Sequence, residues 1–322
     1  MQACIYLNWM NAAHKSFPGR KVVVLNLDET SIAKAYSQMK GTVMLPSAWP
    51  EYNSLDMSEH VNKNKTRCHV SYCAIVASDP LISERLPQVL LASRKNMSRS
   101  LEQHADVMLG VRTHLWVRDS AWMTQEIFLE ILDLLVDALE PYHDFFEFIL
   151  VFDASRVHFS MDIAQKLWFA EIRIVVVPAK LTWLLQPLDT HVFANFKNNL
   201  RKQLQHAALN APDGQLNDRE WIKSVAHCIS QMTSVNHARA FHRNGMMGHQ
   251  IFMKAVESKI LPPDFVDNVG NQTPSLEDVK FCLSLSNVPW YEQVVGDLRQ
   301  TLDLHATGWG ENGRPRVSII LS

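Results

Sequence analysis

The chain has 322 residues, of which 47% are hydrophobic and 20% are charged, and its formal net charge is −2 at pH 7. These proportions are typical of a globular protein with a sizeable core, and they exclude disordered and fibrous chains. No apolar run is long enough for a membrane span, and the N-terminus has no secretory signal pattern. Proteins that bind duplex DNA usually carry a basic excess. We therefore expect any DNA-binding charge to be concentrated on one face, or to belong to a module missing from this chain.

The cysteines favour free thiols over a disulfide or zinc framework. There are five of them, an odd number, and none forms a CxxC pair, which suits a reducing compartment. Cys68, His69 and Cys73 are closely spaced, but they fall inside an alternating segment that is typical of a strand. We interpret them as part of a sheet.

Three strands are predicted in the first part of the chain. Residues 21–27 form a short apolar, β-branched run, which predicts a buried strand ending at Asp28. Residues 67–77 and 87–92 predict two further strands, separated by a Ser-Asp-Pro step. The polar stretch over 36–66 lacks periodicity, so we expect a long loop there. Three successive strands of this kind can pair as an antiparallel meander.

Helices and strands alternate in the next part of the chain. Apolar residues at three- and four-residue spacing over 122–140 predict an amphipathic helix. A buried strand over 147–152 ends at Asp153, a helix near 161–170 follows, and the next strand lies at 172–177. This order predicts strand–helix–strand crossovers beside the meander, and hence a mixed α/β sheet with helices on its faces.

The remaining pattern is helical. A helix that turns basic is predicted from Thr190 to about His206, and two further helices are predicted near 218–234 and 246–259. We find no internal repeat. The chain is accordingly divided into a short N-terminal lead-in over 1–19, an α/β domain over 20–206 and a mostly helical C-terminal extension over 207–322.

Three aspartates are predicted to meet at one edge of the sheet. Asp28 and Asp153 follow strands that can lie side by side, and Asp189 immediately precedes the basic helix. Converging carboxylates repel one another unless a cation neutralises them, and hard oxygen ligands select Mg²⁺ or Mn²⁺. Two such ions can activate a water or a 3′-hydroxyl at a phosphodiester.

The alternative is that these aspartates only cap helices and favour turns, which is common at strand ends and helix starts. Glu29 and Asp119 are acidic neighbours that also qualify for a supporting role. The spacing of the carboxylates alone does not decide between the two interpretations.

A family resemblance bears on this choice. Residues 177–189 read VPAKLTWLLQPLD and continue to a Phe-Lys step at Phe196 and Lys197. This segment closely resembles the pogo-like, or DDE-1, branch of the Tc1/mariner transposase superfamily. There a strand gives way to a proline loop, then to Leu-Leu-Gln-Pro-Leu-Asp, then to a helix. The sequences LNLDET at 25–30 and VFDASRVH at 151–158 resemble two more of its segments, so the likeness spans roughly residues 20–205.

The resemblance implies an RNase-H-like fold whose catalytic, metal-binding triad is Asp28, Asp153 and Asp189. His158 falls on the family's histidine after the second aspartate, and Glu29 is expected to support the site. The implied activity is strand cleavage by water followed by strand transfer, with a two-metal Mg²⁺ or Mn²⁺ site and no organic cofactor. The implied partner is DNA, as transposon ends and target, with a homodimer left open, no membrane, and a nuclear location.

Several residues are candidates for nucleic-acid contact. Lys180 and Trp183 precede Asp189, and the tryptophan either stacks on a base or covers the sheet edge. Lys197, Arg201 and Lys202 either contact phosphates or form an ordinary solvated face. A second candidate patch consists of Arg239, His242 and Arg243.

The sequence departs from the family in two ways. The family usually has asparagine directly after the second aspartate, where this chain has Ala154, and only residues 1–20 precede the first predicted strand, where the family has helix-turn-helix modules. Both departures leave open a domesticated or decayed transposase that only binds nucleic acid or protein. A nuclease of the same fold that acts on RNA–DNA hybrids is a third hypothesis, which predicts sensitivity to a substrate 2′-hydroxyl.

Overall fold

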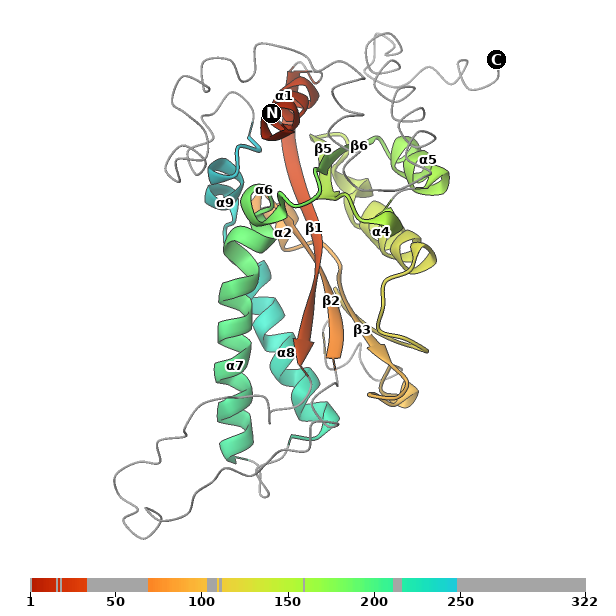
Figure 1. Ribbon diagram of the computed structural model, residues 1–322, viewed down its shortest axis with the longest axis vertical. Coiled ribbons are helices and arrows are strands. Elements are labelled where there is room, and N and C mark those ends of the chain that lie inside the picture. The colour runs from red at the N-terminus through yellow and green to blue at the C-terminus, as the bar shows by residue number, and fades with distance from the viewer. Residues whose placement is uncertain are drawn as a thin grey trace, which may run out of the picture.

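The computed structural model describes residues 2–15, 17, 19–33, 69–102, 109, 112–158, 160–210 and 216–247. Its centre is a six-stranded mixed sheet with the order β4-β3-β2-β1-β5-β6 (Figure 1). The strands are β1 Lys21–Ala33, β2 His69–Ala77, β3 Gln88–Ser93, β4 Thr113–Arg118, β5 Phe146–Asp153 and β6 Ile172–Val177.

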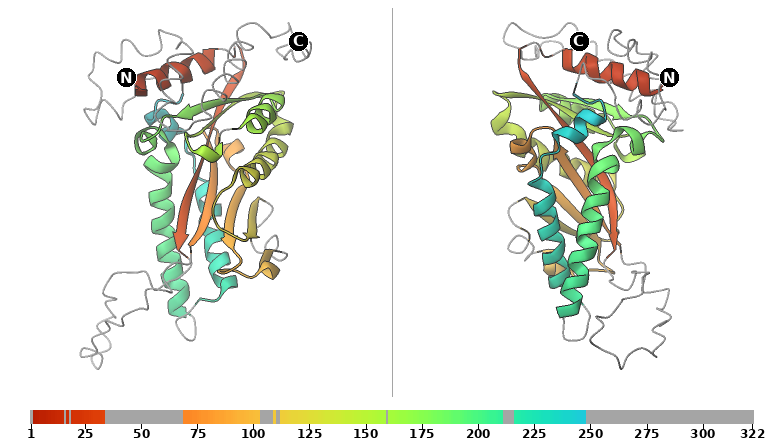
Figure 2. Two further views of the ribbon diagram at one scale, coloured as in Figure 1. Left: turned by 45° about the vertical axis from the view of Figure 1, so that its right-hand side comes forward. Right: turned by 90° about the vertical axis from the view of Figure 1, so that its left-hand side faces the viewer.

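Helices cover both faces of this sheet. Figure 2 shows α4 and α5 on one side, and α7 and α8 on the other. The α-helices are α1 Gln2–Lys15, α2 Pro80–Ser83, α4 Gln125–Leu139, α5 Met161–Phe169, α6 Thr182–Leu185, α7 Phe193–Asn210, α8 Asp218–Thr233 and α9 Ala238–Arg243. Short helical turns are η4 Arg99–Leu101, η5 Glu140–Tyr142, η6 Arg156–His158 and the π-helical turn η7 Leu188–Val192. None of the described helices is both long and apolar enough to cross a membrane.

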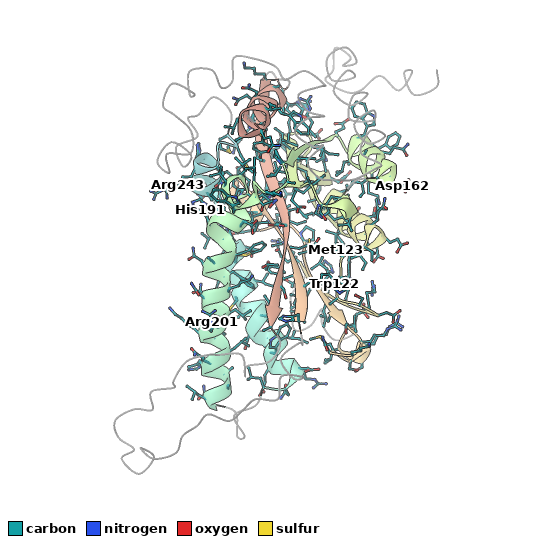
Figure 3. The ribbon with its side chains drawn as sticks, viewed as in Figure 1. Trp122, Met123, Asp162, His191, Arg201 and Arg243 are labelled. Atoms are coloured by element: carbon teal, nitrogen blue, oxygen red, sulfur yellow. The ribbon has the colours of Figure 1, made fainter. Side chains whose placement is uncertain are left out.

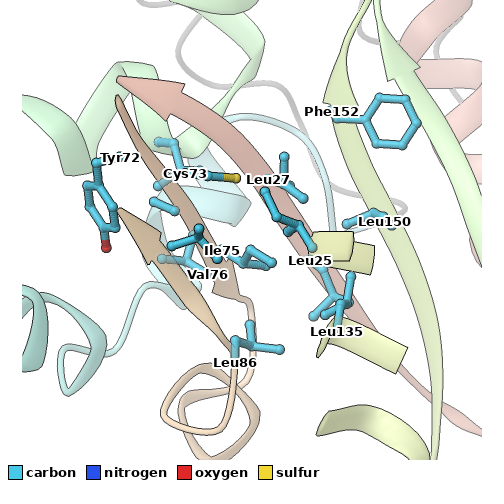
Figure 4. Close-up of a cluster of buried hydrophobic side chains, with 14 of the residues drawn as sticks. Leu25, Leu27, Tyr72, Cys73, Ile75, Val76, Leu86, Leu135, Leu150 and Phe152 are labelled. Atoms are coloured by element: carbon cyan, nitrogen blue, oxygen red, sulfur yellow. The ribbon is translucent and has the colours of Figure 1, made fainter. Parts of the chain in front are cut away.

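The pairing of the strands confirms the predicted RNase-H-like mixed sheet. β1, β2 and β3 pair antiparallel as a meander, and β1 also pairs in parallel with β5, which pairs in parallel with β6. The central strand β1 is covered on both faces, which is why its first half is a continuous apolar run. The core joins β1 side chains such as Leu25 and Leu27 to Leu135 of α4 and Leu150 of β5 (Figure 4).

The strand β4 and the helix α1 were not predicted from the sequence, nor were the short helices α2, α6 and α9. β4 is an edge strand in parallel pairing with β3, and only alternate residues of its THLWVR sequence are buried, so it has no apolar run to mark it. α1 lies in the lead-in and buries Tyr6, Trp9 and Met10. The guanidinium of Arg173 on β6 donates to Ala13 O at 3.1 Å, which fastens the C-terminal end of α1 to the sheet.

The predicted loop over 36–66 lies outside the described residues. Residues 248–259 of the helix predicted at 246–259 also lie outside them. Of the cysteines considered above, Cys73 is a buried free thiol on β2, as the strand interpretation predicts, and Cys68 lies outside the described residues.

Candidate active site

Asp28 and Asp153 are placed by the parallel pairing of β1 with β5. The last pair in that register joins Asn26 to Val151, and the two aspartates each lie two residues further along their strands. The prediction that Asp28 follows the first strand was wrong, because β1 continues to Ala33. Beyond Asn26, β1 pairs with β2 and no longer with β5. Several of its later residues are polar, because β5 does not cover this part of the strand.

Asn26 joins the three segments that carry the aspartates. Its side chain is fully buried. Its Nδ2 donates to Val151 O at 3.1 Å, and its Oδ1 accepts from the backbone N–H of Leu188 at 3.0 Å. One side chain, two residues before Asp28, therefore bonds to both β5 and the η7 turn and aligns the turn with β1.

Asp189 lies on the exposed side of the η7 turn, at the start of the long helix α7. A π-helical turn is wider than an α-helical one and often occurs at functional sites. The next residue anchors the turn, because Thr190 bonds to Gln186 O through its backbone N–H at 2.9 Å and is 2.8 Å from it through Oγ1.

The side chain of Gln186 connects this turn to the other two aspartates. It is fully buried, and its amide is oriented so that both polar atoms are satisfied. Nε2 donates to Asp28 Oδ2 at 2.9 Å, and Oε1 accepts from the backbone N–H of Asp153 at 3.3 Å. The structure thus brings together the three segments on which the sequence placed the acidic triad.

The electrostatics of Asp28 show that the carboxylates interact. Burial raises the pKa of Asp28 well above its ordinary value, and repulsion from Asp189 and Asp153 raises it further. The hydrogen bond from the Glu29 N–H, at 2.8 Å, and the nearby His158 act in the opposite direction but do not cancel the increase. Both the burial of Asp28 and the nearby carboxylates therefore disfavour its charged form.

His158 lies beneath two of the acidic residues. Its Nδ1 is 2.8 Å from Asp153 Oδ1, its Nε2 is 3.5 Å from Glu29 Oε1, and its ring packs on Phe128 at 4.4 Å between centroids. Burial lowers the pKa of His158, but hydrogen bonding and attraction to Asp153 and Glu29 outweigh that effect and raise it to about 10. An imidazolium at this position pairs with the Asp153 carboxylate and holds it in a fixed orientation.

The other acidic candidate lies apart from this cluster. Asp119 is 85% exposed and pairs with Arg94 at 2.8 Å. Ala154, which stands where the family has asparagine, is partly buried against the core, and its N–H donates to Val177 O at 3.1 Å.

The candidate nucleic-acid residues lie on both sides of Asp189 in the chain. Trp183 is 57% exposed, and its indole N–H donates to Lys180 O at 2.9 Å. Lys180 itself has a positive φ of 67°, uncommon for a residue other than glycine. Lys197 is partly buried, Arg201 and Lys202 are exposed along α7, and Arg239, His242 and Arg243 belong to α9 (Figure 3).

The aspartates supply hard oxygen ligands, which Mg²⁺ and Mn²⁺ prefer. Within the described residues, no group of three or more His, Cys, Asp or Glu side chains is arranged to hold a metal ion. The chemistry of the donor set nevertheless fits a divalent cation, because a cation would offset the repulsion that raises the pKa of Asp28.

Some residues that organise the site were missed by the sequence analysis. Asn26, Thr190 and Asn244 make the hydrogen bonds that hold the η7 turn in place. Asn26 could have been noticed in the sequence, since it is the only polar residue between Val22 and Leu27. Asn244 could not have been found in this way, because its partner Thr190 is 54 residues away in the chain.

Comparison with solved structures finds matches to this chain. Two solved structures of the Mos1 transposase are similar to this chain. The Mos1 paired-end complex with the left transposon end has a TM-score of 0.37 and 13% identity over 77% of this chain and 63% of that chain. The pre-cleavage Mos1 transpososome has a TM-score of 0.34 and 11% identity over 74% of this chain and 62% of that chain. This chain thus spans less than two thirds of the length of either Mos1 chain.

A comparison with curated protein sequences finds no match. The family model described as DDE superfamily endonuclease matches residues 65–251, which is more than half of the chain. The match contains Asp153 and Asp189 but begins after Asp28, so the place of Asp28 rests on the strand pairing described above. The family predicted from the Leu-Leu-Gln-Pro-Leu-Asp block is thereby confirmed: this chain belongs to the DDE superfamily endonucleases.

Proposed function

We propose that this protein is a metal-dependent nuclease of the cut-and-paste transposase type, which cleaves DNA phosphodiester bonds and joins strands. The observation that carries the proposal is the convergence of Asp28, Asp153 and Asp189 from three separate elements, which the buried side chains of Asn26 and Gln186 connect. A domain that only binds a partner gains nothing from gathering carboxylates that repel one another.

In this proposal the three aspartates would hold Mg²⁺ or Mn²⁺. When bound, such ions supply a nucleophilic water or hydroxyl and neutralise the charge that develops on the phosphodiester oxygens. The protein's own part is to place the carboxylates. The imidazolium of His158 orients the Asp153 carboxylate, and Glu29 stands on the other side of that ring, 3.5 Å from Nε2.

The helix α7 supports DNA as the substrate. It begins just after Asp189, and its 18 residues include Lys197, Arg201 and Lys202 but no aspartate or glutamate. At about 1.5 Å per residue it extends roughly 27 Å from the acidic cluster. In a chain with a net charge of −2, this long helix thus carries basic residues and no acidic ones, which suits it to a phosphate backbone. Trp183, exposed and fixed through its N–H, is suited to stack on a base beside the cleavage point.

The remaining parts of the proposal follow from the substrate. DNA would be bound as transposon ends and target, cleavage and joining at paired ends would suit a homodimer, and a DNA substrate would place the protein in the nucleus. Arg239, His242 and Arg243 on α9 are proposed as a second contact region.

The proposal is tested first by Mn²⁺ titration calorimetry on the wild-type chain and on Asp153→Ala. We expect micromolar-to-millimolar binding by wild type that disappears in the variant, followed by Mn²⁺-dependent cleavage of DNA ends. Asp119→Ala is the matched control, because it removes an aspartate that pairs with Arg94 instead of joining the cluster, and it should bind Mn²⁺ like wild type. If folded wild-type protein binds no Mn²⁺, the chain is a decayed transposase that acts as a binding domain.

The role of α7 is tested by the salt dependence of DNA binding. Replacement of Arg201 and Lys202 by glutamine should weaken binding equally on all sequences and reduce the salt slope by about 1 for each lost phosphate contact. Lys223→Gln, which removes an exposed lysine of α8, is the control and should leave the slope unchanged. An unchanged slope in the α7 double variant would mean that this helix is an ordinary solvated face.

A further inference from the structure

The C-terminal helix α9 reaches the acidic cluster through a buried polar side chain. Asn244, the residue that ends α9, is fully buried. Its Nδ2 donates to Leu184 O in α6 at 2.7 Å, which fixes the orientation of the amide and leaves its Oδ1 facing Thr190 Oγ1 at 3.0 Å. Asn244 thus contacts the segment on either side of Gln186 and Asp189.

The bonds of Thr190 extend this contact to the other aspartates. Its hydroxyl lies within hydrogen-bond distance of three groups: His191 Nδ1 at 2.7 Å, Gln186 O at 2.8 Å and Asn244 Oδ1 at 3.0 Å. The single proton of the hydroxyl can go to only one of them at a time. Its backbone N–H also donates to Gln186 O, and the side chain of Gln186 then bonds to Asp28 and to the N–H of Asp153. A continuous set of hydrogen bonds therefore runs from α9 to the carboxylate of Asp28 and to the backbone N–H of Asp153, and it passes through the η7 turn that carries Asp189.

The geometry of the turn that ends α9 gives this contact a fixed support. Gly245 has a φ of 72°, a conformation that favours glycine, and it turns the chain directly after Asn244. Met246 N donates back to Phe241 O at 3.0 Å, and Met246 O is 2.8 Å from His14 Nε2 of α1. The amide of Asn244 is consequently held from both sides and acts as a rigid support for the η7 turn.

From these contacts we infer that Asn244 is a positioning residue for Asp189, so that the 216–247 segment forms a working part of the candidate active site. This inference rests on the proposed metal-dependent function. Asp189 lies on the exposed side of the η7 turn, so the position of its carboxylate depends on where the backbone of the turn is held. Without Asn244, the buried carbonyl of Leu184 would lose this donor. The η7 turn would also lose one of its supports, and the position of Asp189 would be less well defined.

The test compares Mn²⁺ affinity, measured by calorimetry on the full chain, for matched variants at the two ends of α9. Asn244→Ala should weaken Mn²⁺ binding about tenfold or more, as loss of the groups behind metal ligands usually does. Asn236→Ala is the control, because Asn236 caps the opposite end of the same helix by accepting from Ala238 N at 2.9 Å. It should lower the melting temperature while binding Mn²⁺ like wild type.

A second pair of variants keeps the inference testable if Asn244→Ala fails to fold, as judged by circular dichroism. Thr190→Val preserves the shape of the side chain and removes the hydroxyl, so it should also weaken Mn²⁺ binding, whereas Thr190→Ser should restore most of the affinity. Wild-type affinity in Asn244→Ala or in Thr190→Val, or an equal loss in Asn236→Ala, would overturn the inference. Absence of Mn²⁺ binding by wild type would overturn the proposed function, and the inference with it.

Discussion

The sheet and the η7 turn place their carboxylates in different ways. Asp28 and Asp153 are partly buried and sit on neighbouring strands, whose register continues through six consecutive residue pairs, from Lys21 with Phe146 to Asn26 with Val151. Asp189 is exposed on a single π-helical turn, held by side-chain bonds from Asn26 and Asn244.

This difference indicates which part of the site one substitution can disturb. A strand ladder distributes the placement of Asp28 and Asp153 over many backbone hydrogen bonds, so no single side chain decides it. The η7 turn depends on a few buried side chains, each of which makes two bonds. Because a buried polar group left without its partner costs more than the net value of one hydrogen bond, these few residues have a large effect on the turn.

The largest effect is expected at His158, which pairs with Asp153 on the sheet. A pKa of about 10, raised above the ordinary 6.5, means that the folded state keeps a proton that the unfolded state loses. The stability from this group is complete below pH 6.5 and is lost as pH rises through about 10. The difference corresponds to on the order of 3–5 kcal/mol. We expect urea unfolding of the metal-free protein to show this decline, and His158→Gln to make it shallower.

The control for this experiment is His227→Gln, which replaces an exposed histidine of α8 and should keep the wild-type pH dependence. Equal slopes for wild type and His158→Gln would contradict the ion pairing of His158 with Asp153 and Glu29. The carboxylate of Asp153 on the sheet would then be held no more firmly than that of Asp189 on the η7 turn.

A smaller effect is expected where the sheet and the turn meet, at Asn26. Asn26→Leu keeps the approximate volume but leaves the buried N–H of Leu188 without an acceptor, at a cost of about 2 kcal/mol in the free energy of unfolding. Since the same bond aligns η7 with β1, Mn²⁺ affinity should also fall about tenfold. Asn199→Leu, on the exposed face of α7, should change stability by no more than about 0.5 kcal/mol. A loss of stability at normal Mn²⁺ affinity would show that the junction matters for folding alone.

The sheet side could be predicted from the sequence because its signals are local. Apolar runs marked β1, β5 and β6, and their order was enough to place Asp28 beside Asp153. β4 was not predicted because an edge strand buries one face and leaves polar residues on the other, so its sequence has no continuous apolar run. The end of β1 was misplaced because polar residues after Asp28 resemble a loop unless the pairing with β2 is known.

The turn could be found only through a motif, and its supports could not be found at all. The Leu-Leu-Gln-Pro-Leu-Asp block identified Asp189, yet nothing local shows that Gln186 bonds to Asp28, 158 residues away in the chain. The bond between Thr190 and Asn244 likewise depends on how α9 packs. Contacts of this kind are set by the tertiary structure, whereas periodicity reports only which face of an element is buried.

The smallest expected effect concerns Ala154, the one position of the sheet side that departs from the family. Its methyl group is partly buried beside Asp153 and offers no ligand. Ala154→Asn would add a neutral oxygen next to the cluster, so calorimetry should show Mn²⁺ affinity rising by up to about tenfold, equivalent to about 1.4 kcal/mol. Ala154→Leu, which adds bulk without an oxygen, should give no increase. If Ala154→Asn leaves the affinity unchanged, the sheet side is already complete without a ligand at 154, and the turn alone limits metal binding.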